Sequence, residues 1–444
     1  MHWKATTILI CVYGILKEFR PATPFLTPYL ISGYKNLTLD EVYGQIFPFW
    51  TYSYMIFLVP IFFLTDILRY KPIVVLEGAC LCCTWALLVW GEGVRQMQLM
   101  QICFGLASAS EIAYYSYMYA IVDEKNYRRV TSYIRSAALV GKLFAFALAQ
   151  FLVSTETGSY LLLNQISLAA VCIVFFIALA LPRVPSPRVR QEVQEELVRE
   201  QESQPEQQGL TRGEVERRKL ERGVRNYLTT TFKNFQIFKE NMVVLKWSAW
   251  WALASCGIFQ IYNYIQALWL EMQPDPSNVE NGLTEFMNTL TGAILAFAIQ
   301  FAAIDWIKYG ELTLTISSCM IAVVLAVISQ TSHVVLAYVG YVCITSIYHT
   351  LITAASCNIA IELTSTNYGL VFGWNTFVAV LLQALLTLVV ADSHGLNLDM
   401  RTQFVVYSMY FVAVGALFLV VSIWSRCKKS STDPIRTDVT QDNE

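Results

Sequence analysis

The chain has 444 residues, of which 55% are hydrophobic and only 14% are charged, and its formal net charge is -2. This composition is too apolar for a soluble globular protein and provides no broad basic surface for a nucleic acid. Ten of the eleven cysteines lie in apolar runs, including Cys80 and Cys83 at CxxC spacing, so we interpret them as small core residues and predict no metal site. The sequence therefore indicates an all-α protein that crosses a lipid bilayer many times.

Apolar runs of about 20 residues, the length that crosses a bilayer, recur twelve times. The first run is too long and too charged internally for a cleaved signal peptide, so we expect it to remain as a span kinked at Pro21. Within it, the spacing of Lys17, Glu18 and Arg20 allows local pairing. The predicted spans are 6–32, 46–65, 72–91, 98–122, 130–153, 159–181, 243–269, 284–307, 311–329, 334–362, 368–391 and 402–425.

The fourth span contains one ionisable residue, Glu111, in an otherwise apolar helix. A carboxyl near the bilayer centre costs about 2.5 to 3.5 kcal/mol even on lenient insertion scales, so it normally faces a polar cavity or a partner. We predict that its helical face lines a substrate, ion or proton path. A structural ion pair with Arg135 or Lys142 on the fifth span is the alternative. The residues that share this face are Gln101, Phe104, Ser108 and Tyr115.

Between the sixth and seventh spans lies a segment, 182–240, that is rich in Glu, Gln, Arg and Pro and cannot bury an apolar face. We predict a largely disordered cytoplasmic linker there, with a surface helix within 210–239. It separates an N-terminal six-helix half, 1–181, from a C-terminal six-helix half, 241–425, which a tail, 426–444, follows. This layout predicts the major facilitator fold, in which substrate binds near the midplane between two halves.

Lysines and arginines concentrate in the loops on one side of the predicted spans, which the positive-inside rule makes the cytoplasmic side. The opposite loops carry only Lys35, Arg95 and Arg401. The glycosylation sequon Asn36-Leu37-Thr38 lies in the first of these opposite loops, which predicts modification of Asn36 outside the cell. Both termini are then expected to be cytoplasmic.

Short motifs occur in order through both halves: Arg20-Pro21, Trp50-Thr51-Tyr52-Ser53-Tyr54, Glu111-Ile112-Ala113-Tyr114-Tyr115, Asn263-Tyr264 and Asn375-Thr376-Phe377. Together they resemble the thiamine and reduced-folate carrier family, and only the central linker and the tail lie outside the resemblance. The family implies a plasma-membrane carrier of a water-soluble vitamin, with no cofactor and no enzymatic activity. The absence of a Walker-type GxxxxGK[ST] loop from the sequence agrees with secondary transport.

The resemblance also implies the cargo and the side chains that bind it. Thiamine carriers have a glutamate where the folate carrier has an arginine in the fourth span, and Glu111 matches the thiamine type. Lys142 stands where thiamine carriers have a pocket tyrosine, and its cation suits a folate carboxylate. Thiamine is slightly favoured as cargo, and folate is the alternative. The implied substrate-binding residues are Phe47, Trp50, Glu111, Tyr114, Tyr115, Lys142, Asn263 and Glu285.

Four other charged residues are assigned structural or gating roles: Arg20, Asp66, Arg69 and Arg135. Asp66 and Arg69 resemble the short cytoplasmic loop that latches the halves of major facilitator proteins together. We expect transport by alternating access, with coupling to a proton or to an organic anion left open. A sensor that binds the vitamin without moving it is the more remote alternative. No converging catalytic set indicates an enzyme.

Overall fold

The computed structural model of the protein describes residues 3–68, 70–119, 127–182, 236–273, 279–298, 306–362 and 368–432. Within these ranges, each predicted membrane span after the first overlaps a long helix, whereas the first is divided. The N-terminal half contains α1 (Trp3–Glu18), α3 (Phe47–Leu68), α4 (Lys71–Trp90), α5 (Gly93–Tyr119), α6 (Tyr127–Ser154) and α7 (Tyr160–Ala180). The C-terminal half contains α11 (Met242–Met272), α12 (Asn281–Ala298), α13 (Trp306–Gln330), α14 (Val334–Glu362), α15 (Tyr368–Val390) and α16 (Met400–Thr432).

Eight of the helices in the described ranges are long and apolar enough to cross a membrane. They are α4, α6, α7, α11, α13, α14, α15 and α16. The other four long helices, α1, α3, α5 and α12, carry polar and charged side chains that are described below. The prediction of an all-α, multi-pass membrane protein is confirmed.

The first predicted span, 6–32, is broken rather than continuous. After α1 ends at Glu18, the chain forms a 3-10 turn, η1 (Thr23–Phe25), and a short helix, α2 (Leu26–Ile31). Pro21 accounts for the break, because it has no N–H to donate and its ring disfavours the helical conformation of the residue before it. A π-helical turn, η2 (Glu41–Ile46), then leads into α3.

The predicted linker, 182–240, lies outside the described residues except for Pro182 and residues 236–240, which include the short helix α10 (Ile237–Glu240). At the start of the second half, the Asn241 side chain caps α11 by accepting hydrogen bonds from the N–H groups of Val243 and Val244. Since α16 continues to Thr432, it extends past the predicted start of the tail. The division into halves, linker and tail stays a prediction where it falls on residues outside the description.

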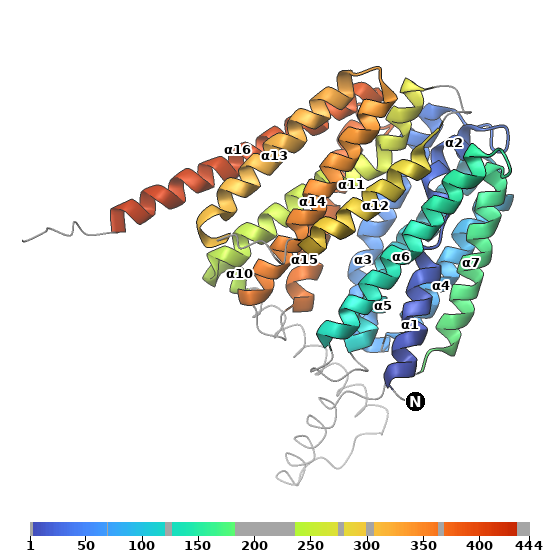
Figure 1. Ribbon diagram of the computed structural model, residues 1–444, viewed down its shortest axis with the longest axis horizontal. Helices are drawn as coiled ribbons and strands as arrows, with labels where there is room; N and C mark the ends of the chain where they lie inside the picture. The colour runs from blue at the N-terminus through green and yellow to red at the C-terminus, as the bar shows by residue number, and fades with distance from the viewer. Residues whose placement is uncertain are drawn as a thin grey trace, which may run out of the picture.

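The two halves lie side by side, with the N-terminal half in blue to green and the C-terminal half in yellow to red (Figure 1). They meet where α3 contacts α15, where α6 contacts α12, and where η1 and α2 contact α12 and α11. Several of these contacts involve the ends near loops 32–40 and 391–399, which the positive-inside rule places outside the cell. We call these the outer ends.

Glycines allow the helices of the N-terminal half to approach each other closely. A Cβ atom at Gly141 would overlap the backbone of Ile15, so α6 packs directly against α1. A Cβ atom at Gly105 would overlap the Ser53 side chain, so α5 packs directly against α3. Small residues serve this purpose in membrane proteins because lipid supplies no hydrophobic drive for helix association and packing must supply it.

Candidate substrate site

A cavity of about 160 Å³ lies between the halves near their outer ends. The segment 22–27 and helices α3, α4 and α5 form its walls on one side, and α11 forms the other. Three of the predicted site residues, Phe47, Trp50 and Asn263, line it. The remaining lining residues are Ala22, Thr23, Leu26, Thr27, Thr84, Trp85, Leu88, Met100, Gln101, Phe104, Tyr262 and Gln266.

Aromatic rings dominate one wall of the cavity. Trp50 stacks on Phe104 with ring centroids 6.2 Å apart, and Trp85 meets Phe104 edge-on at 6.0 Å. The indole Nε1 of Trp50 donates a hydrogen bond to Ser108 Oγ at 3.1 Å, which fixes the plane of the ring. Ser108 lies on the predicted polar face of α5. This wall is suited to stack against a flat heterocycle.

At the cavity, side-chain amides of α11 in the C-terminal half form hydrogen bonds to the N-terminal half. Asn263 Nδ2 donates to Thr51 Oγ1 at 3.3 Å. Gln266 Nε2 donates to the Thr23 carbonyl at 3.0 Å, while its Oε1 accepts from the Thr27 N–H at 3.3 Å. Each of these hydrogen bonds is made by a side-chain amide at the cavity surface. The same amide can instead donate a hydrogen bond to a polar cargo or accept one from it.

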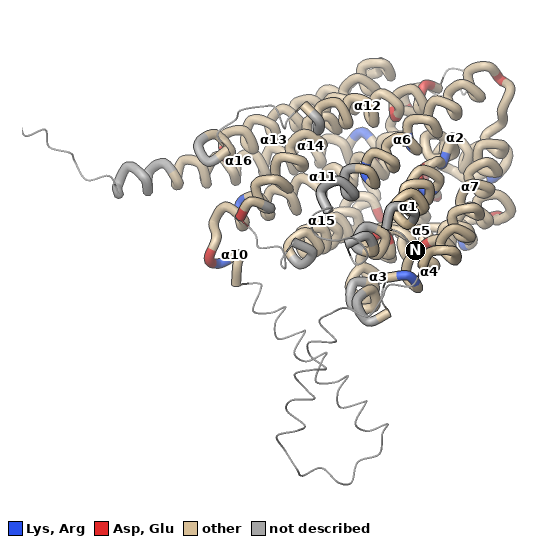
Figure 2. The backbone as a smooth tube through the Cα atoms, turned by 60° about the horizontal axis from the view of Figure 1, so that its bottom comes forward, with Lys and Arg blue, Asp and Glu red and all other residues tan. Residues whose placement is uncertain are grey.

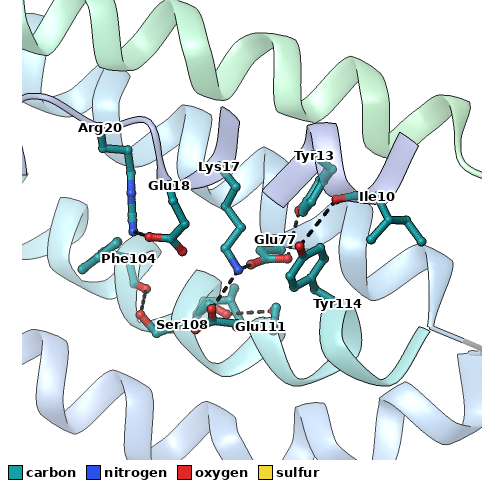
Figure 3. Close-up of polar contacts among 12 residues, drawn as sticks. Ile10, Tyr13, Lys17, Glu18, Arg20, Glu77, Phe104, Ser108, Glu111 and Tyr114 are labelled. Atoms are coloured by element: carbon teal, nitrogen blue, oxygen red, sulfur yellow. Dashed lines mark hydrogen bonds and ion pairs between the residues drawn. The ribbon is translucent and has the colours of Figure 1, made fainter. Parts of the chain in front are cut away.

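Below the aromatic wall, one lysine lies between two carboxylates (Figure 3). Lys17 Nζ on α1 lies 2.7 Å from Glu77 Oε1 on α4 and 2.9 Å from Glu111 Oε1 on α5. Tyr13 donates to the other oxygen of Glu77 at 2.9 Å. The side chains of Lys17 and Glu77 are 5% and 1% exposed, whereas that of Glu111 is 38% exposed. We call these three ionisable residues the Lys17 cluster.

A second charged group adjoins the first. Glu18 Oε2 lies 2.9 Å from Arg20 Nη2 and 3.6 Å from Lys142 Nζ on α6. The Arg20 guanidinium also lies over the rings of Trp85 and Phe104, at 5.5 and 5.9 Å from their centroids. The second group, the Glu18 cluster (Glu18, Arg20 and Lys142), is therefore in contact with the wall of the cavity. Charged residues are sparse along the rest of the helices (Figure 2).

The partner of Glu111 differs from the two considered in the sequence analysis. Lys142 pairs with Glu18 instead, and Arg135 is exposed on α6. The partner is Lys17, a second charged residue inside a predicted span. A lysine in a span was a signal available in the sequence, because an intramembrane charge needs an opposite charge nearby. Spacing along the chain could not reveal the pair, since two predicted spans lie between α1 and α5.

Two predicted site residues have partners away from the cavity lining. Tyr114 is buried beneath Lys17, whose Nζ lies 4.6 Å from the centroid of its ring, and it packs against Tyr13. Glu285 on α12 accepts hydrogen bonds from Tyr341 at 2.8 Å and from Asn288 at 3.0 Å. Their roles in substrate binding stay predictions.

The structure describes only some of the remaining assigned residues. Asn36 lies in an exposed outer turn with a φ of 52°, accessible as glycosylation requires. Tyr115 and Asp66 lie on α5 and α3, but their side chains are outside the description, as is Arg69. The proposed latch formed by Asp66 and Arg69 therefore stays a prediction.

Tyr52 on α3 forms a second bridge between the halves. Its hydroxyl donates to Asp392 Oδ2, in the loop after α15, at 2.5 Å. His394 donates its backbone N–H to Oδ1 of the same carboxylate at 2.8 Å. Burial alone would raise the pKa of Asp392, but the hydrogen bonds from Tyr52 and His394 outweigh burial and lower it, so the acceptor stays ionised. The halves are thus held together at their outer ends.

Replacing Tyr52 by phenylalanine is expected to increase how often the two halves separate at their outer ends. A hydrogen bond to a charged acceptor contributes about 1.5 to 3 kcal/mol, so labelling from outside should become about tenfold faster or more. The measurement is the rate at which a membrane-impermeant thiol reagent labels Thr27→Cys, because Thr27 is 1% exposed in this closed arrangement. Tyr34→Phe, in an exposed outer turn, is the matched control. Equal labelling rates with and without Tyr52→Phe would contradict the bridge.

Two helical halves with a cavity of polar and aromatic side chains between them have the architecture of the major facilitator fold. Solved structures show the same fold. The D-xylose-proton symporter matches with a TM-score of 0.64 at 9% identity, covering 93% of this chain and 96% of that chain. A mutant of the nucleoside transporter NupG matches with a TM-score of 0.62 at 13% identity, covering 94% and 99%.

The family model described as reduced folate carrier matches residues 1–406. The chain belongs to this family of vitamin carriers. It is 54% identical to folate transporter 1 of Caenorhabditis elegans over 435 residues, which cover 97% of this chain and 95% of that protein. It is 37% identical to human thiamine transporter 1 over 475 residues, covering 99% and 94%. The resemblance found in the short motifs is confirmed.

Proposed function

We propose that the protein imports a folate-type vitamin, a flat heterocycle with an anionic carboxylate tail, across the plasma membrane by alternating access. The observation that carries this proposal is the position of Lys17. Its ammonium lies 2.9 Å from Glu111 and, although it also pairs with Glu77, it weakens the attraction of the Glu111 carboxylate for the thiazolium cation of thiamine. We therefore propose folate as the cargo, whereas the sequence slightly favoured thiamine.

The neighbouring charges support an anionic cargo. Arg20 and Lys142 share one carboxylate oxygen of Glu18, so this cluster has one more cation than anion. The Lys142 side chain is 42% exposed, which makes its ammonium available to a carboxylate. In the proposed pose, the heterocycle stacks on Trp50 and Phe104 while the carboxylate tail reaches Lys142. The name of the folate transporter relative supports the same cargo.

Thiamine remains a second candidate because one observation favours it. The Glu111 carboxylate is 38% exposed beside an aromatic wall, which suits an aminopyrimidine and a nearby cation. Relatives with 36 to 38% identity are named thiamine transporters. The two candidates place the essential charge on different residues, so substitutions can distinguish them.

The test is uptake of labelled folate and labelled thiamine by cells that produce the protein, with each competed by the other. For a folate carrier, Lys142→Ala should raise the folate concentration needed for half-maximal exchange about tenfold or more, because a charged hydrogen bond is lost. Glu111→Gln should change it less than about twofold. Val140→Ala, on the same helix and 39% exposed, is the control. The reverse ranking, with thiamine as the transported cargo, would overturn the proposal in favour of the second candidate.

A further inference from the structure

We propose that Cys83 on α4 and Cys103 on α5 form a dithiol site that a hydroperoxide in the surrounding lipid oxidises to a disulfide. The disulfide displaces the aromatic wall of the cavity and thereby weakens cargo binding. The Sγ atoms of the two cysteines lie 3.5 Å apart. This modification does not depend on which vitamin the protein carries.

The contact between the two sulfur atoms comes from the packing of α4 against α5. The two helices follow each other in the chain and pack side by side. The Cys103 thiol donates a weak hydrogen bond to the Cys83 sulfur across this interface. A disulfide holds its sulfur atoms about 2.05 Å apart, so the pair has to close by a small rotation of the side chains and a small shift of the helices. The two thiols are therefore already close to bonding geometry.

Both thiols lie on a face of the N-terminal half that carries exposed apolar side chains. Cys83 is exposed and Cys103 is half-buried. On α4 the same face carries Trp90, which is 72% exposed, and on α5 it carries Leu99, which is 49% exposed. Such a face is suited to contact acyl chains. The interpretation of the cysteines as core residues is therefore wrong for Cys83.

The pair lies within the outer half of the bilayer. With a rise of about 1.5 Å per residue, Cys83 lies about 10 Å along α4 from Trp90 at the outer end, and Cys103 lies about 15 Å along α5 from Gly93. The hydrocarbon core is about 30 Å thick. Unsaturated acyl chains carry hydroperoxide groups when they are oxidised. A lipid hydroperoxide of the outer leaflet can therefore reach the thiols without leaving the membrane.

The proposed reaction consumes one hydroperoxide, ROOH. The sulfur of Cys83, the more exposed thiol, attacks the terminal peroxide oxygen and the O–O bond breaks. The thiol proton passes to the leaving alkoxide, which gives a sulfenic acid and an alcohol, ROH. The Cys103 sulfur then attacks the sulfenic sulfur, so that the S–S bond forms, the S–O bond breaks and the hydroxide leaves with the Cys103 proton as water. The two sulfurs together lose two electrons, and the peroxide gains them.

Three other thiols lie near the pair but are placed differently. Cys80 lies one helical turn before Cys83 and is buried. Cys82 faces α7, where its thiol donates to the carbonyl of Val171 at 3.3 Å and also contacts Cys172. The pair formed by Cys83 and Cys103 combines a sulfur–sulfur contact with exposure to lipid, and the pair formed by Cys82 and Cys172 serves as the internal comparison.

The other face of the same two helices forms part of the aromatic wall. Trp85 follows Cys83 by two residues, and Phe104 is the residue after Cys103. Their rings meet edge-on at 6.0 Å, and Trp50 stacks on Phe104. Closely packed side chains transmit a displacement because there is little free space to absorb it. Drawing the two sulfurs together therefore moves Trp85 and Phe104 relative to each other, and the cargo loses part of its stacking surface.

The experiment uses the full chain in proteoliposomes that contain either a phospholipid hydroperoxide or the corresponding hydroxy phospholipid. Because a thiol in apolar surroundings reacts more slowly than an exposed thiolate, the treatment is followed over hours. Mass spectrometry without reduction should find a peptide of α4 joined to a peptide of α5 through Cys83 and Cys103. The concentration of the transported vitamin at half-maximal exchange should rise several-fold, and dithiothreitol should reverse the rise.

Variants and a second oxidant identify the site and the source of the oxidant. Cys83→Ala and Cys103→Ala should each abolish the cross-link and keep exchange at its untreated level. Cys319→Ala, which removes an exposed thiol on α13, is the matched control and should respond like the wild type. Hydrogen peroxide added to the water in the same molar amount should give much less cross-link, and an equal yield would overturn the assignment to a lipid oxidant.

Three other outcomes would overturn the proposal. They are the absence of any cross-link, a cross-link of Cys82 to Cys172 in its place, and a disulfide between Cys83 and Cys103 that leaves exchange unchanged. The proposed cargo is tested separately, because exchange of labelled folate and thiamine by the untreated protein does not involve the oxidant.

Discussion

Replacing Lys17 by methionine is expected to destabilise the protein strongly. The substitution removes the ammonium between Glu77 and Glu111 and leaves two carboxylates facing each other, one of them 1% exposed. Removing one partner of a buried ion pair costs about 3 to 5 kcal/mol, because the remaining charge is neither hydrated nor compensated. We expect the midpoint of thermal unfolding of the purified protein to fall by several degrees and its amount at the cell surface to fall with it.

A second substitution tests the physical reason. Adding Glu77→Gln to Lys17→Met removes the buried charge that the first change leaves behind, so it should restore a large part of the lost stability. Lys239→Met, at an exposed position on α10, is the matched control and should have little effect. If the double variant is as unstable as Lys17→Met alone, the cluster does not stabilise the fold by charge compensation.

Replacing Trp50 by alanine is expected to cause the largest loss of cargo affinity among the residues of the aromatic wall. The indole stacks on Phe104 and is oriented by Ser108, so it presents a flat face to the cavity. Stacking of a heterocycle on an aromatic side chain contributes about 1 to 3 kcal/mol, which corresponds to about a 5- to 150-fold increase in Kd.

The measurement is displacement of labelled folate from the purified protein, with labelled thiamine in parallel. Trp50→Phe keeps an aromatic face and should recover most of the affinity, whereas it loses the hydrogen bond to Ser108. Trp90→Ala is the control because Trp90 is 72% exposed at the end of α4. Equal affinity in Trp50→Ala and the wild type would mean that the cargo binds elsewhere.

Much of the fold could be predicted from the sequence, because the bilayer requires long apolar helices and penalises every charge within them. Each predicted span after the first overlaps a long helix, and the first span is broken beside Pro21. Phe47, Trp50 and Asn263 line the cavity, as the resemblance implied. Glu111, Tyr114, Lys142 and Glu285 do not line it, because resemblance identifies positions and not the direction that each side chain takes in this chain.

The sequence by itself determined that this protein is a multi-pass vitamin carrier of the reduced folate carrier family and that Glu111 needs a partner inside the membrane. Only the tertiary structure decided which partner it has. Lys17, Glu77 and Glu111 come from α1, α4 and α5, and helix packing brings the Lys17 ammonium within 3 Å of an oxygen of each carboxylate. An ion pair depends on distance in space, and the chain order of helices in a bundle does not specify it.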